Sequence, residues 1–209
     1  MSRVFLLSPA NCNGERARML LDERARFPLA QRLRAPAGVP IGEAFAFISG
    51  LYFRGKLAYV RRFACPPHGL ASAYVITPNC GLWPVEEPVT LAALRSFAAV
   101  DIAAADERYR KPVERDVKVV ADVLRAAGDD AEAVLLGSVA SGKYVDVLLG
   151  ILGERLRFPA AFVGRGDMSR GGLMLRSARA GEELEYVPVA GAVRRGARPP
   201  KLPKLPRTG

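Results

Sequence analysis

The feature that most constrains the fold is a wholly apolar tetrapeptide, residues 133–136, that runs directly into a glycine-containing loop. Its sequence, Ala-Val-Leu-Leu, has no polar side chain to place toward solvent, which is typical of a strand buried on both faces. Residues 137–142 form the loop, and residues 143–152 have the apolar periodicity of a helix. A buried strand, a tight loop and a helix in this order predict an α/β fold with a parallel sheet.

The same patterns divide the rest of the chain into strands and helices. Strands are predicted at residues 4–8, 57–63, 73–77, 160–163, 173–176 and 184–187. Helices are predicted at residues 14–26, 43–49, 90–98 and 112–127. We therefore expect an α/β fold with a mixed, mainly parallel central sheet, helices on both faces and a strand-rich C-terminal part. No linker or internal repeat interrupts residues 1–193, which are expected to form a single domain.

Composition excludes several classes of protein. Half of the 209 residues are hydrophobic, so the chain can bury a large core and is not disordered. No apolar run approaches the roughly 20 residues that span a bilayer, and the short apolar start is interrupted by Asn11, so we expect a cytoplasmic protein without a membrane partner. Three cysteines argue against a disulfide framework. Cys65 and His68 have ligand-like spacing, but Cys12 and Cys80 stand alone, so no metal is predicted, and no cofactor either.

The net charge of +10 is concentrated at the C-terminus. From residue 194 onward the chain has six basic residues, no acidic residue and four prolines, and without this stretch the net charge falls to +4. Residues 194–209 are therefore interpreted as an extended basic, proline-rich arm. Such an arm either neutralises phosphates of a polyanion or solubilises the terminus. We expect it to contribute affinity for polyanions and not to the fold.

The loop after the apolar tetrapeptide matches the phosphate-loop pattern of glycine, four residues, glycine and lysine. Gly137, Ser138, Ser141 and Lys143 are the candidate phosphate-binding residues, because loop amides and a helix N-terminus attract anions. Tyr144 replaces the Ser or Thr that would hold magnesium in a nucleotide hydrolase. The pattern therefore indicates a simple phosphate or anion site, or a tight turn whose glycines pack the strand against the helix.

Residues 164–172 form a second polar segment between predicted strands. Its arginines, Arg165 and Arg170, have the fork geometry that suits phosphate or carboxylate. Ser169 can add a hydrogen bond, and Asp167 could orient an arginine, bind a ribose hydroxyl or act as a general base. The alternative is a polar hairpin loop with solvated charges.

The loop that follows the first strand should lie at the same edge of the sheet. Ser8, Asn11 and Arg16 offer hydrogen bonds to a base, sugar or phosphate. Cys12 is a candidate nucleophile, because a helix N-terminus lowers the pKa of a thiol. His68 is the only histidine that could serve as its base, and a cysteine without such a partner is structural.

One further segment, residues 52–56, interleaves aromatic and basic side chains. Tyr-Phe-Arg-Gly-Lys could stack on bases and neutralise phosphates. It could equally be the turn before the strand predicted at residues 57–63.

Three of these segments together resemble the YaaA-related proteins. They are FLLSPANC at residues 5–12, YVITPNCGLWP at residues 74–84, and LLG at residues 135–137 followed by Lys143-Tyr144. The resemblance covers residues 3–152 in outline and does not include residues 164–172. It implies an α/β fold and an association with DNA, through damage protection in some members and deazapurine base modification in others.

These observations lead to a functional expectation. We expect a nucleic-acid-associated protein, DNA in preference to RNA, with a phosphate- or nucleotide-binding cleft, and with a base or N-glycosidic bond as its site of action if it is an enzyme. The alternatives are an enzyme for a small nucleotide or phosphorylated metabolite, and a non-catalytic interaction module. Arg165, Asp167, Ser169 and Arg170 are expected to face the same cleft as Asn11, Cys12 and the loop at residues 137–142.

Overall fold

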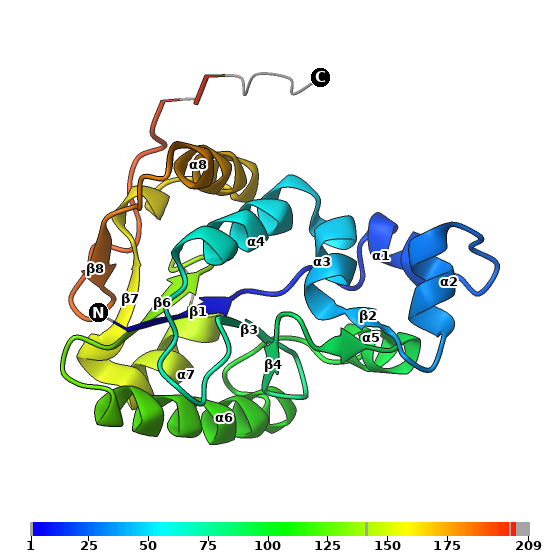
Figure 1. The fold of residues 1–209 in the computed structure, drawn as a ribbon, viewed down its shortest axis with the longest axis horizontal. Helices are drawn as coiled ribbons and strands as arrows, with labels where there is room; N and C mark the ends of the chain where they lie inside the picture. Colours follow the sequence, from blue (N-terminus) through cyan, green and yellow to red (C-terminus); the bar gives the residue numbers. More distant parts are fainter. Residues whose placement is uncertain (1, 141, 201, 204–209) are drawn as a thin grey trace.

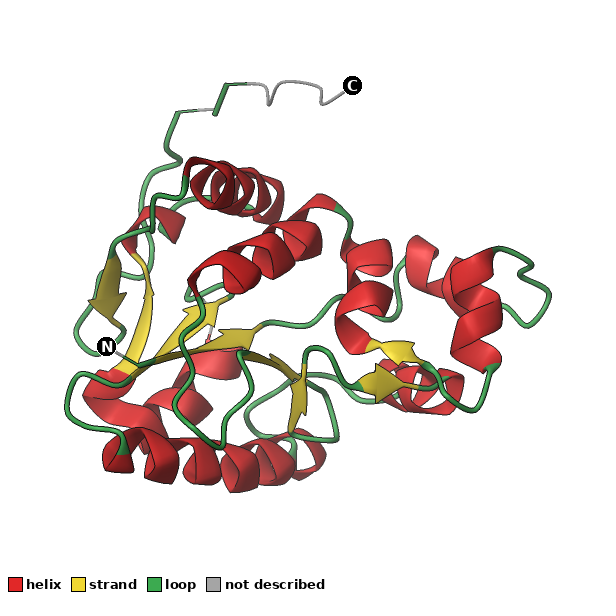
Figure 2. Ribbon diagram, in the orientation of Figure 1, coloured by secondary structure: helices red, strands yellow, loops and turns green. Residues whose placement is uncertain are grey.

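One central sheet organises the computed structural model, which describes residues 2–140, 142–200 and 202–203. Its strands are β1 (Arg3–Leu7), β3 (Ala73–Ile76), β4 (Leu82–Pro84), β6 (Glu132–Leu136), β7 (Leu156–Pro159) and β8 (Tyr186–Pro188). They lie in the order β4-β3-β1-β6-β7-β8, with antiparallel strands at both edges and four parallel strands between them. The α/β class and the mainly parallel sheet expected from the sequence are therefore confirmed (Figure 2).

Side chains of the central strand β1 alternate between two hydrophobic cores. Phe5 and Leu7 pack into one core, whereas Val4 and Leu6 pack into the other. The neighbouring strand β6 pairs with β1 in parallel along its whole length, and both strands are fully buried. A sheet that is buried on both faces needs a layer of helices on each side.

Helices cover both faces, as Figure 1 shows. On one face lie α4 (Leu51–Phe63) and α8 (Asp167–Ala180), and on the other lie α6 (Glu107–Ala126) and α7 (Gly142–Leu152). Two short 3-10 turns, η1 (Gly153–Arg155) and η2 (Ala160–Phe162), flank β7. Within the described part of the chain, no helix is both long and apolar enough to cross a membrane.

The remaining helices form a lobe beyond the carboxyl end of β1, at the right of Figure 1. This helical lobe consists of α1 (Glu15–Leu21), α2 (Pro28–Arg34), α3 (Ile41–Ser49), α5 (Leu91–Ala98) and a two-stranded ribbon of β2 (Val39–Pro40) and β5 (Pro88–Val89). Phe27 and Phe47 stack within it with ring centroids 5.2 Å apart. Its interior belongs to the same core as Phe5 and Leu7, so the lobe packs onto the sheet as part of one body.

The strand predicted at residues 57–63 is wrong, because this segment is the second half of α4. Phe53, Leu57 and Val60 are buried at the spacing of one helical face, while Arg54 and Arg61 are exposed. The β-branched and aromatic residues favoured a strand, and Gly55 was interpreted as part of a preceding turn. Residues 52–56 are therefore neither a surface patch nor a turn.

The strand-rich C-terminal part is confirmed only in part. Residues 173–176, predicted as a strand, lie inside α8, and residues 160–163, also predicted as a strand, form η2 and the turn after it. The strand in this region is β7, which precedes the predicted one and ends at Pro159. The glycine pair at residues 171 and 172 looked like a hairpin signal, but it lies on the buried face of the helix.

Two helix boundaries also differ from those predicted. The helix expected at residues 14–26 ends at Leu21, and Pro28 starts the separate helix α2. The helix expected from residue 112 begins at Glu107, because Asp106 caps it by accepting a hydrogen bond from the Arg108 amide. Pro112 then lies inside the helix.

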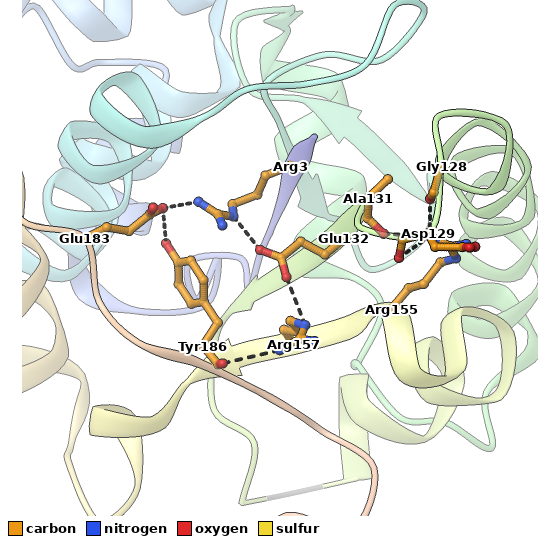
Figure 3. Close-up of polar contacts among 9 residues, drawn as sticks. All are labelled: Arg3, Gly128, Asp129, Ala131, Glu132, Arg155, Arg157, Glu183 and Tyr186. Carbon is orange, nitrogen blue, oxygen red and sulfur yellow. Dashed lines mark hydrogen bonds and ion pairs between the residues drawn. The ribbon is translucent and has the colours of Figure 1, made fainter. Parts of the chain in front are cut away.

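A buried ion-pair network joins the amino ends of three strands (Figure 3). The Glu132 carboxylate on β6 lies 2.6 Å from Arg3 on β1 and 2.9 Å from Arg157 on β7. Only 3% of the Glu132 side chain is exposed. Arg3 also pairs with Glu183 and lies over the Tyr186 ring, 4.6 Å from its centroid. The network ties these three adjacent strands together at their amino ends, opposite the helical lobe.

The first part of the basic arm packs against the body of the protein. Arg195 Nε donates to the carbonyl of Ala140 at 3.2 Å, and Arg165 Nη1 donates to the carbonyl of Pro200 at 3.5 Å. Arg176, on α8, donates to the carbonyl of Pro203. The arm therefore makes more contact with the fold than its sequence indicates.

Candidate functional site

The carboxyl ends of β1 and β6 form the centre of the candidate site. Loops after these adjacent parallel strands lead to opposite faces of the sheet, to the helical lobe and α4 on one side and to α7 on the other. Ligands of open α/β sheets bind at such a switch point. Ser8 follows β1 and Gly137 follows β6, and a Cβ added to Gly137 would lie only 3.0 Å from that of Ser8. The two loops therefore touch, and a side chain at residue 137 would push Ser8 aside.

A polar cavity of about 210 Å³ opens between this edge and the helical lobe, lined from the lobe side by Phe97 of α5. We call it the carboxyl-edge cavity. Its polar and aromatic lining includes Asn11, Asn13, Phe97, Asp101, Lys143 and Tyr144, and its wall continues through Pro9, Ala10, Cys12, Pro78, Val100 and Ile102. This volume is below the 300–1,000 Å³ of pockets for drug-sized ligands, so it suits one small ring or sugar.

A second group of functional side chains lies beside the cavity where α4 crosses α8. The helices touch through glycines: a Cβ on Gly55 would lie 2.5 Å from the carbonyl oxygen of Gly171, and one on Gly171 would lie 2.7 Å from the Cα of Tyr52. This close approach brings Lys56, next to Gly55, toward Arg170, next to Gly171. The crossing thus assembles charged groups from distant parts of the chain.

Lys56 is fully buried at this crossing. Its Nζ lies 2.7 Å from both the carbonyl oxygen and the hydroxyl oxygen of Ser8, and 4.0 Å from the centroid of the Tyr52 ring. Burial lowers the pKa of Lys56 to about 7, with the charge of Asp167 opposing this shift and that of Arg170 adding to it. No carboxylate among the described residues forms an ion pair with this amine.

Arg170 is buried and is held by neighbours on its own segment. It donates to the carbonyl of Phe162 at 3.4 Å and lies 3.4 Å from the Asp167 carboxylate, which is itself largely exposed. Arg170 therefore keeps a positive charge at the inner end of the site, close to Tyr52, whose pKa it lowers.

Two tyrosine hydroxyls complete the group. Burial raises the pKa of Tyr52 to about 12 and that of Tyr144 to about 12, so both stay protonated near neutral pH. The Tyr52 hydroxyl is buried and lies near Ser8 and Arg170, but no described residue meets it in good hydrogen-bond geometry. Tyr144 lines the carboxyl-edge cavity and also lies close enough to Tyr52 and Asp167 to interact with their charges. It therefore stands between the cavity and the buried group.

The structure brings most of the sequence-predicted residues to this edge. Asn11, Cys12, Lys143 and Tyr144 line the cavity, and Ser8, Asp167 and Arg170 surround Lys56. Gly137 lies against Ser8, and Ser138 follows it in the loop, half-buried. Ser141 lies outside the residues that the structure describes.

Three predicted residues lie elsewhere. Arg165 and Ser169 hydrogen bond to each other at 3.2 Å and line a separate pocket with Arg198 and Pro200 of the arm. Arg16 lies over the Phe47 ring in the helical lobe, 4.8 Å from its centroid. The composite cleft expected from the sequence is therefore divided, because residues 167–172 form a helix that directs Arg170 inward and Ser169 toward the arm.

Cys12 has the environment of a structural cysteine. Its side chain is buried, and burial raises the pKa of the thiol to about 12, which disfavours the reactive thiolate. The possible partner His68 lies in the loop that precedes β3, near Cys65, which pairs with the first residue of β1. Cys12 follows the carboxyl end of β1, so Cys12 and His68 lie at opposite ends of the parallel strands.

The glycine loop also differs from a phosphate loop. A Cβ on Gly142 would lie 2.1 Å from Asp146 Oδ2, so a carboxylate occupies the space beside the N-terminus of α7. This carboxylate faces a shallow pocket with Arg194 and Arg195 of the arm, whereas Lys143 belongs to the carboxyl-edge cavity. A negative side chain at this point opposes binding of a phosphate to the first turn of the helix.

The sequence suggests residues 52–56 as a surface patch or a turn, and neither interpretation predicts that Lys56 and Tyr52 are buried beside Ser8. Their spacing of four residues places both on one side of a helix, and Phe53, Leu57 and Val60 give the helical periodicity that could have identified it. Gly55, a residue typical of turns, made this helical periodicity harder to recognise.

Comparison of the chain with protein-family models, with curated proteins and with solved structures gives no match.

Proposed function

We propose that this chain is a nucleic-acid-associated protein that binds one nucleotide unit, of DNA in preference to RNA, in the carboxyl-edge cavity. The observation that carries the proposal is the convergence of the loops after β1 and β6 on one polar cavity at the switch point of the sheet. The preference for DNA rests on the resemblance of residues 3–152 to the YaaA-related proteins.

The lining of the cavity supports a nucleotide as ligand. Asn11 accepts a hydrogen bond from the Asn13 amide through Oδ1, and Asn13 donates to the Ala98 carbonyl through Nδ2, so the other half of each side-chain amide can pair with the edge of a base. Tyr144 supplies aromatic surface for stacking. Lys143 is exposed at the cavity and can neutralise one phosphate. The volume of about 210 Å³ favours one base over a longer segment.

The arm supports a polymeric ligand. Arg195 lies beside the loop after β6, where it donates to Ala140, and Arg194 lines the same pocket. The arm starts in the pocket beside the first turn of α7, whose next residue Lys143 lines the cavity, and Arg198 then lies against α8. A nucleic acid bound in the cavity could place its neighbouring phosphates along this line.

A second candidate function is an enzyme that acts on a small molecule. It is favoured by the buried pair of Lys56 and Ser8, which binding alone does not require.

The binding proposal is tested by fluorescence anisotropy of a labelled single-stranded DNA oligonucleotide over a range of NaCl concentrations. We expect Lys143→Gln to weaken binding and to reduce the slope of log K against log salt by about 0.7, the value for one phosphate contact on a single strand. Lys118→Gln, an exposed lysine on α6 outside the cavity, is the matched control and should change neither. Equal effects of the two substitutions, or binding that does not depend on salt, would contradict the proposal. The same oligonucleotide made of RNA should bind more weakly.

A further inference from the structure

Ser8 and Lys56 have the geometry of a nucleophile and its base. The 2.7 Å between Ser8 Oγ and Lys56 Nζ lies within the 2.6–3.2 Å expected of such a pair. The Ser8 carbonyl, also 2.7 Å from Nζ, accepts a second hydrogen bond and orients the amine. Ser–Lys pairs are one of the recurring arrangements in which a lysine replaces histidine as the base.

The fold holds this pair in place from several directions. The Ser8 amide donates to the Leu136 carbonyl at 3.4 Å, which ties the residue to β6. The Tyr52 and Phe53 rings, with centroids 4.0 Å and 5.3 Å from Nζ, enclose the lysine amine. Desolvation by this enclosure favours the neutral amine, the form that can accept a proton, and the pKa of about 7 places the change near neutral pH.

A separate observation points to a ligand at the pair. The Tyr52 hydroxyl is buried, and no described residue meets it in good hydrogen-bond geometry, so a bound group in line with it would complete its hydrogen bonding. Burial raises the pKa of Tyr52, whereas weak hydrogen bonding to Arg170 and Ser8 lowers it, so the hydroxyl lies beside both side chains. A donor and a guanidinium next to a serine hydroxyl are suited to stabilising the oxygen of a carbonyl group under attack.

We propose that Ser8 is the nucleophile and Lys56 the general base of an ester hydrolase centre, with Tyr52 and Arg170 stabilising the oxyanion. This activity goes beyond the proposed nucleic-acid binding and does not depend on it. The substrate class is an ester with a small acyl group, because Ser8 is only 5% exposed and does not line the carboxyl-edge cavity.

The reaction proceeds in two balanced steps. In the first step, Ser8 Oγ bonds to the carbonyl carbon of the ester while its proton passes to Lys56 Nζ. The ester C–O bond then breaks, and Lys56 gives the proton to the departing alkoxide. In the second, water gives a proton to Lys56 and attacks the acyl carbon, the bond from that carbon to Ser8 Oγ breaks, and the proton returns to Ser8. The net products are the alcohol and the carboxylic acid.

A fluorophosphonate probe, which phosphonylates activated serines, tests the proposal without nucleic acid present. We expect one adduct on Ser8, identified by peptide mass spectrometry, and no adduct in Ser8→Ala. Lys56→Met should slow labelling by at least about 100-fold, the lower range for loss of a general base. Ser177→Ala, which removes another buried serine hydroxyl on α8, is the control and should label at the rate of the unchanged protein.

The pH dependence gives a second reading. The labelling rate should rise with pH, with a midpoint near pH 7 that reports the pKa of Lys56. The ionisable groups around this lysine are Tyr52 of α4, Tyr144 of α7, and Asp167 and Arg170 of α8. An unlabelled Ser8 in the folded full-length protein would overturn the proposal, as would an adduct only on another residue or labelling that survives Lys56→Met in a folded variant. DNA binding measured on the same samples decides the nucleic-acid proposal separately.

Discussion

The backbones of Gly55 and Gly171 are in direct contact, so neither residue has room for a side chain: a Cβ on Gly55 would lie 2.5 Å from the Gly171 carbonyl oxygen. This contact sets the distance between α4 and α8 and thereby the position of Lys56 relative to Arg170. We expect Gly171→Ala to lower the free energy of unfolding by about 1–3 kcal/mol, because its new methyl group would meet the backbone of Leu51 and Tyr52.

The matched control for this substitution is Gly150→Ala on α7, where the added Cβ meets nothing within 4 Å. It should raise stability by about 0.5–1 kcal/mol, since alanine is the better helix former. Chemical denaturation measures both variants. A neutral Gly171→Ala would show that α4 and α8 can separate without cost.

The buried amine of Lys56 should make stability depend on pH. Its pKa is about 7 in the folded protein and 10.5 as the ordinary value, so between these limits the unfolded chain binds more protons than the folded one. The free energy of unfolding should therefore rise with pH from about pH 7 to pH 10.5. Below about pH 7 Lys56 is protonated in both states and adds no further slope. Thermal unfolding from pH 6 to pH 10 measures the slope, and Lys56→Met should remove that part of it. An identical slope in the variant would show that Lys56 is not desolvated.

Substitution of Glu132, in the ion-pair network at the amino ends of the strands, should lower stability strongly. Glu132→Gln removes the negative charge that pairs with both Arg3 and Arg157, and breaking a buried pair in this way costs about 3–5 kcal/mol. Glu86→Gln breaks an exposed pair with Arg61 and should change stability by less than about 1 kcal/mol. If urea denaturation gave equal losses for the two variants, the Glu132 network would not be buried as the structure shows it.

The arm should contribute to the fold as well as to binding. Deletion of residues 194–209 removes the Ala197 carbonyl that packs against Gly164 and the contacts to Arg165 and Arg176. We expect a loss of about 1 kcal/mol, which corresponds to a fall of about 2–4 °C in the thermal midpoint of a chain of this size. Salt dependence of DNA binding should flatten in the same variant. An unchanged thermal midpoint would show that the arm acts only through its charge, as its sequence indicates.

The sequence by itself determined the α/β class and the position of the central strands. An apolar tetrapeptide such as residues 133–136 can only be buried, and a glycine loop and a helix after it leave one arrangement for a parallel strand. Asn11, Lys143 and Tyr144, which the sequence singles out, line one cavity, because the carboxyl ends of parallel strands meet at one edge of the sheet.

Only the tertiary structure decided where the charged groups go. Residues 52–56 and 164–172 look like turns locally, since glycine and mixed charges are signals of loops. In the fold both glycine positions serve the contact of α4 with α8, which outweighs the local preference and encloses Lys56 beside Ser8. Whether a lysine is solvated or buried against a serine depends on helix packing between segments more than one hundred residues apart, and no local pattern carries that information.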